Sequence, residues 1–100
     1  MNKVFLGKWR ITEMDLCDPE HGYIKFNPDG NGEFEFGAVS CHMTCGHSET
    51  IVHFKFEGSA ECDEVFGDGW VELDEDSTDT MTGCFEFWNG DEFEFRARKL

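Results

Sequence analysis

Large apolar residues alternate with charged or polar ones in four separate stretches of this 100-residue chain. A period of two residues is typical of a half-buried β-strand, because successive side chains of a strand point to opposite faces. No amphipathic helix of three turns is evident, so the sequence predicts an all-β fold. The alternating apolar residues are Phe34, Phe36, Ala38, Val52, Phe54, Phe56, Phe85, Phe87, Phe93, Phe95 and Ala97.

Turn signals separate these stretches. Segments 27–32, 66–70 and 88–91 are rich in the Asn, Asp and Gly residues that tight turns favour, and Asn89-Gly90 is the strongest hairpin signal. Eight short sequential strands with hairpin spacing favour a small up-and-down antiparallel barrel, and a two-sheet sandwich is the alternative. The predicted strands span roughly 6–15, 22–27, 32–40, 41–47, 50–57, 69–74, 80–88 and 91–98.

The length limits the chain to a single domain over residues 1–100. An eight-stranded barrel is just wide enough to be filled by side chains or to hold one small ligand. Two interpretations therefore stay open: a filled aromatic core, or a pocket for a small apolar or amphipathic molecule. The residues predicted to line such a pocket are Trp9, Glu13, Phe36, Phe54 and Phe87. The phenylalanines predicted to face inward are Phe34, Phe36, Phe54, Phe56, Phe85, Phe87, Phe93 and Phe95.

Glu13 follows Trp9 at the period that carries side chains toward the interior. An inward carboxylate must find a partner or take up a proton. The alternative position is the barrel mouth, where Glu13 is solvated or paired with Arg96 or Lys25.

The chain is strongly acidic, with 22 Asp and Glu against 8 Lys and Arg and a net charge of −14. Nucleic acid and anionic membranes are therefore not expected as partners, because both are recognised through Lys and Arg. No Lys or Arg lies between Phe56 and Phe95. Such a run is either a solvated face or a surface that attracts a basic protein partner. Trp70, Trp88 and Met14 are predicted to face outward, which favours an interface such as a homodimer.

Cys41, His42, Cys45 and His47 are potential zinc ligands within seven residues. On a strand, however, His42 would point away from the other three, so a compact metal site would require a loop here. We favour structural thiols and expect no metal or cofactor. Five cysteines without the apolar run of a signal peptide favour reduced thiols and a cytoplasmic location.

The sequence shows no nucleophile elbow, phosphate-binding loop or closed metal motif, so we expect a protein that is not an enzyme. The acidic residues of 29–33 and 74–79 are interpreted as turn residues, because neither segment fits a calcium loop. A cleft shared by Glu13 and the acidic segment 61–64 would favour an enzyme instead.

Gly7-Lys8-Trp9, together with Arg96 or Arg98 on the last strand, resembles the lipocalin (calycin) pattern. In that pattern a Gly-x-Trp sequence closes one barrel end and a late basic residue packs over the indole. The chain also resembles a group of small uncharacterised bacterial proteins, through segments 7–14, 23–26, 29–39, 63–70, 90–91 and 95–97. It departs from that pattern at Ala60, Asp68 and Trp88, where Asp, Arg and His are expected. The group has no assigned activity, so the resemblance implies only the barrel fold.

Overall fold

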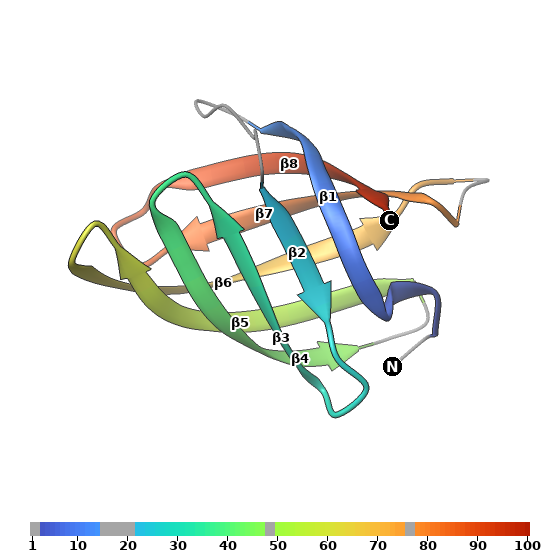
Figure 1. Ribbon diagram of the computed structural model, residues 1–100, viewed down its shortest axis with the longest axis horizontal. Coiled ribbons are helices and arrows are strands. Elements are labelled where there is room, and N and C mark those ends of the chain that lie inside the picture. The colour runs from blue at the N-terminus through green and yellow to red at the C-terminus, as the bar shows by residue number, and fades with distance from the viewer. Residues whose placement is uncertain (1–2, 15–21, 48–49, 76–77) are drawn as a thin grey trace.

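The alternating stretches form the strands of one closed antiparallel barrel (Figure 1). The computed structural model describes residues 3–14, 22–47, 50–75 and 78–100. Each strand pairs with its sequence neighbours, and β8 returns to pair with β1, so the barrel prediction is confirmed and the sandwich alternative is wrong. No helix among the described residues has the length and apolar character needed to cross a membrane. The elements are η1 (Lys3–Phe5), β1 (Gly7–Met14), β2 (Tyr23–Phe26), β3 (Asn31–Phe36), β4 (Val39–His47), β5 (Ile51–Ala60), β6 (Asp63–Leu73), β7 (Thr80–Phe87) and β8 (Glu92–Lys99).

Aromatic rings occupy the middle of the barrel. The ring of Phe85 stacks on those of Phe34 and Phe95, with centroids 4.3 Å apart in both pairs. Phe36 and Phe54 lie 5.3 and 5.9 Å from the same ring. These separations are those of aromatic rings in contact. Of the eight phenylalanines predicted to face inward, six are buried, while Phe87 and Phe93 are half-buried and pack edge to face against each other.

Trp9, near the start of β1, is fully buried. Its indole N–H donates a hydrogen bond of 2.9 Å to the carbonyl oxygen of Phe5 in η1. The ammonium of Lys99 lies 4.9 Å from the centre of the indole ring and donates to the carbonyl oxygens of Val4 and Leu6. A late basic residue therefore packs over the indole, but it is Lys99 and not Arg96 or Arg98, both of which are exposed.

The prediction of a tight turn at 66–70 is wrong, because this segment lies inside β6. Gly67 and Gly69 leave room for neighbouring rings: an added Cβ would lie 2.9 Å from Phe56 at Gly67 and 2.7 Å from Phe54 at Gly69. The chain instead reverses at Glu61 and Cys62, whose φ angles are 51° and 86°. Two successive positive φ angles define the two-residue turn whose twist suits a β-hairpin.

The side-chain directions predicted for Ala38 and Met14 are also wrong, and of the two interpretations of Glu13 the inward one is wrong. The register of β1 against β8 shifts between Ile11 and Glu13, and the carboxylate of Glu13 is exposed rather than directed inward. A bulge of this kind reverses the side of the sheet that the following residues face. Ala38 is exposed as well, because it lies in the turn between β3 and β4 with Gly37, whose φ is 53°.

Candidate functional site

Two large aromatic side chains lie exposed on the outside of the barrel. Phe66 is 56% exposed and Trp88 is 60% exposed. Their ring centroids are 5.6 Å apart and their planes differ by 13°, so the two rings stack. The backbone N–H of Trp88 donates to the carbonyl oxygen of Phe66 at 2.9 Å, which fixes the two residues beside each other. Exposed apolar groups of this size often mark a binding surface.

The strand pattern explains why both rings face outward. Along β6, Val71 and Gly69 are buried, Val65 and Gly67 are partly covered, and the residues between them point to the other side of the sheet. Phe66 therefore shares the outer face with Asp68. Trp88 directly follows Phe87, which packs against the core, so the same alternation turns the indole away from the interior.

A surface groove of about 450 Å³ adjoins the aromatic pair. A row of paired residues crosses it from β5 to β8, in which Lys55 pairs with Asp68, Asp68 with Glu86, and Glu86 with Glu92. The groove thus carries three carboxylates and one ammonium group. We call this surface the aromatic–acidic groove and define it by Lys55, Phe66, Asp68, Glu86, Trp88 and Glu92.

Two carboxylates of the groove, with that of Glu94, act on the buried thiol of Cys84. Burial and the negative charges of Glu86, Glu92 and Glu94 together raise the pKa of Cys84 to about 11. Like charges disfavour the thiolate, and the same field favours a bound cation. The aromatic–acidic groove is therefore suited to positively charged groups.

Of the five residues predicted to line an interior pocket, four lie in or against one packed core within the described part of the chain. Trp9, Phe36 and Phe54 are buried in this core, and Phe87 packs against it. Glu13 is exposed and lies beside Arg96 in a separate surface groove. Phe54 and Phe87 also reach surface grooves, beside Cys45 and in the aromatic–acidic groove.

The cysteine and histidine residues of 41–47 lie on a strand, as the pattern predicts. Cys41 is buried, Cys45 is half-buried, and His42 is exposed on the outer face opposite Glu33 and Glu57. Burial raises the pKa of both thiols to about 11, with a further contribution from Asp29 at Cys45. In the described residues, no group of three His, Cys, Asp or Glu side chains is placed to hold a metal ion.

The two acidic features that would together have favoured an enzyme belong to different surfaces. Glu13 lines a groove of about 370 Å³ with residues of β7 and β8, among them Thr82 and Glu94. Glu61 lies instead in the turn between β5 and β6, and Glu64 lies near the start of β6. The described residues of the Glu13 groove do not include them.

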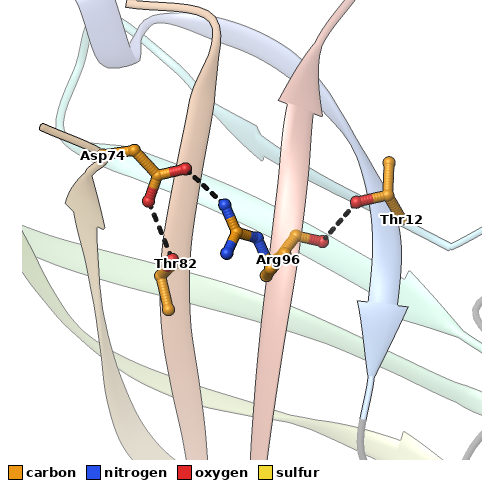
Figure 2. A network of polar contacts seen from close by, with 4 residues as sticks. All are labelled: Thr12, Asp74, Thr82 and Arg96. Atoms are coloured by element: carbon orange, nitrogen blue, oxygen red, sulfur yellow. Dashed lines mark hydrogen bonds and ion pairs between the residues drawn. The ribbon is translucent and has the colours of Figure 1, made fainter. Parts of the chain in front are cut away.

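A polar network joins three strands near the Glu13 groove. Figure 2 shows the side chain of Arg96 reaching from β8 across β7 to Asp74, at an N–O distance of 2.8 Å. The hydroxyl of Thr82 donates to the other oxygen of Asp74 at 2.8 Å, and that of Thr12 donates to the carbonyl oxygen of Arg96 at 3.3 Å. Arg96 thus bonds to Asp74, although Glu13 is its neighbour in register.

We predict that Asp74→Asn destabilises the protein by about 1 kcal/mol at neutral pH, because it weakens a charge-assisted network at the surface. Hydrogen bonds from Thr80 and Thr82, with the charge of Arg96, hold the pKa of Asp74 below its ordinary value of 3.8. A carboxylate whose pKa is lowered by folding stabilises the protein at pH values above its ordinary pKa. This contribution is lost as the pH falls through the lowered pKa of the folded state. Urea unfolding at pH 7 and at pH 2.5 should show the difference between variant and wild type shrinking in acid.

The matched control is Glu75→Gln, which removes the same charge from the adjacent exposed residue. We expect no loss of stability at pH 7 from this control. An equal loss in both variants would mean that the network around Asp74 contributes nothing specific to stability.

The sequence predicts that Trp88 faces outward, but it does not predict its contact with Phe66. The two glycines that follow Phe66 predict a turn there, although the segment forms part of β6. The available signal was the period of two, which places Phe66, Asp68 and Trp70 on one face if 66–70 is taken as a strand. Trp70 is half-buried on that face, and Met14 is half-buried against the core.

A scan against models of known protein families gives no match, and searches against curated proteins and against solved structures give none either.

Proposed function

We propose that this barrel is a non-catalytic interaction module that binds a basic protein partner in the aromatic–acidic groove. The observation that carries the proposal is the exposed, stacked pair of Phe66 and Trp88 beside three carboxylates. Aromatic residues dominate binding energy at protein interfaces, and carboxylates select and steer cationic groups. The combination matches an extended segment that carries Lys or Arg with a large apolar side chain.

The packed interior supports an outer binding surface over a ligand held inside the barrel. Phe85 of β7 contacts the rings of Phe34 in β3 and Phe95 in β8, and its own side chain is fully buried. Aromatic rings in mutual contact occupy the region where a ligand of an eight-stranded barrel would lie.

A peptide titration tests the proposal. The probe is a synthetic peptide with the sequence Trp-Val-Lys-Arg-Lys, blocked at both ends, added to ¹⁵N-labelled protein and followed by NMR. We expect shifts to concentrate around the aromatic–acidic groove, and a peptide with its basic residues replaced by Glu and Asp to leave the spectrum unchanged. Trp88→Ala should weaken binding about 30-fold, corresponding to about 2 kcal/mol for an exposed aromatic anchor.

Control variants separate the groove from general properties of the surface. Leu100→Ala removes an exposed apolar residue elsewhere on the barrel and should leave the affinity unchanged. The double variant Glu86→Gln with Glu92→Gln should weaken binding severalfold, and Glu72→Gln with Glu75→Gln should not, although both pairs change the net charge equally. Shifts spread over the whole surface would contradict the proposal, and a dimer with Trp88 at its interface would favour the homodimer instead.

Two finer assignments are proposals as well. A lipocalin-like relationship is supported by Gly7, Trp9 and the ammonium of Lys99 over the indole. A cytoplasmic location is supported by the free thiols of the described cysteines Cys41, Cys45, Cys62 and Cys84.

A further inference from the structure

The strand β6 begins before its neighbour β7 is beside it. Residues 63–66 pair with β5, from Asp63 opposite Ala60 to Phe66 opposite Glu57. On the other side, the pairing with β7 starts only at Gly67 opposite Phe87. The chain then turns toward β8, with the N–H of Phe87 donating to the carbonyl oxygen of Asp91 at 2.8 Å. The β5–β6 hairpin and the β7–β8 turn lie at the same end of the barrel (Figure 1).

The start of β6 therefore has one edge that no described strand covers. The carbonyl oxygen of Phe66 accepts the last bond on this side, from the N–H of Trp88. In an antiparallel ladder the N–H and C=O of one residue point to the same neighbour, and every second residue repeats that direction. Glu64 thus directs its N–H and C=O toward the open edge, whereas the position opposite Phe66 on this side is already occupied by Trp88. We call residues 63–65 the open edge of β6.

Charge decides which strand could add there. Asp63 and Glu64 are exposed on the open edge, and Glu61 and Asp91 are exposed on the two turns beside it. Two copies paired through this edge would bring like charges close together, which destabilises a strand pair. A segment rich in Lys or Arg would instead meet opposite charges along the same edge.

We infer that the basic partner binds by adding an extended strand to the open edge of β6, next to Phe66 and Trp88. This inference rests on the proposed function and specifies how the partner is held. Backbone hydrogen bonds to Glu64 would supply the pairing, and the aromatic pair would hold one large side chain. The geometry selects a segment that is extended, basic over several residues and apolar at one end.

The direction of the strand fixes the order of its residues. An antiparallel segment runs from the aromatic pair toward Asp63, so its first side chain lies next to Phe66 and Trp88. The next residue lies opposite Val65, which packs against the core, and should be apolar. The following residues lie opposite Glu64 and Asp63 and should be basic. The probe peptide Trp-Val-Lys-Arg-Lys has this order.

The test compares the probe peptide with the same peptide N-methylated at its first lysine. N-methylation removes the N–H that would pair with Glu64 and leaves every side chain in place. We expect the methylated peptide to bind at least tenfold more weakly. We also expect the unmodified peptide to slow hydrogen exchange at the amide of Glu64. Glu64→Pro should weaken binding similarly, because proline removes an edge donor, and Glu64→Gln should weaken it less.

The outcomes separate this inference from the proposed function. Equal affinity of the two peptides, with shifts at Trp88 and none at the Glu64 amide, would overturn strand addition and leave groove binding intact. No binding of either peptide at millimolar concentration would overturn both. Protection of the Glu64 amide that grows with protein concentration alone would assign the edge to a second copy and overturn the basic partner.

Discussion

Phe85→Ala is expected to destabilise the barrel by about 4 kcal/mol, because truncation of a buried phenylalanine removes its contacts and leaves a cavity. Phe85 is fully buried and stacks on both Phe34 and Phe95. Small domains unfold with only about 5–15 kcal/mol, so this single change removes a large part of the stability. For a chain of this length the midpoint of thermal unfolding should fall on the order of 20 °C. Urea and thermal unfolding both measure the effect.

The half-buried Phe93 provides the matched comparison. Phe93→Ala removes the same atoms at the partly exposed end and should cost about 1–2 kcal/mol. Equal losses at the two positions would mean that the centre of the barrel is not packed.

The same variant also tests whether the barrel interior can hold a ligand. Apolar cavities created by truncation stay dry and bind small molecules such as benzene. We expect benzene to raise the unfolding midpoint of Phe85→Ala and to leave that of the wild type unchanged, because a ligand stabilises the state that binds it. A comparable stabilisation of the wild type would restore the interpretation of the barrel as a small-molecule binder.

The number and order of the strands follow from the sequence because alternation is a local signal. Phe34 with Phe36, and Phe54 with Phe56, place one face of each strand in the core wherever the pairing partners lie. The sequence predicts the positions of the turns less well than those of the strands. Glu61 and Cys62 adopt the positive φ angles of a tight hairpin turn without the Asn-Gly sequence that usually marks one.

The candidate site was largely beyond sequence reasoning because it depends on register. The row from Lys55 through Asp68 to Glu92 comes from three successive pairings, and none of them can be read from a single strand. The open edge of β6 depends on where β7 ends relative to it. The inward interpretation of Glu13 is wrong for a related reason, since one register shift reverses the side to which the following side chains point.

Gly69→Ala is expected to destabilise the protein by about 3 kcal/mol, at the upper end of the effect of overpacking a closely packed core. The added Cβ would meet the carbonyl oxygen of Cys84 and lie 2.7 Å from the ring of Phe54. To avoid these close contacts, β6 would have to move away from β7, which would also displace Phe66 from Trp88. The variant should therefore lose peptide affinity under conditions where it is still folded.

Gly46→Ala is the control, because this glycine also lies in a strand and an added Cβ there would meet no atom within 4 Å. Alanine restricts the unfolded chain more than glycine does, so this variant should be unchanged or more stable by roughly 0.5 kcal/mol. Urea unfolding of the two variants gives the comparison. If Gly69→Ala were as stable as Gly46→Ala, segment 66–70 would not be a strand held against Phe54. Phe66 and Trp88 would then not share one outer face, because their arrangement depends on that strand.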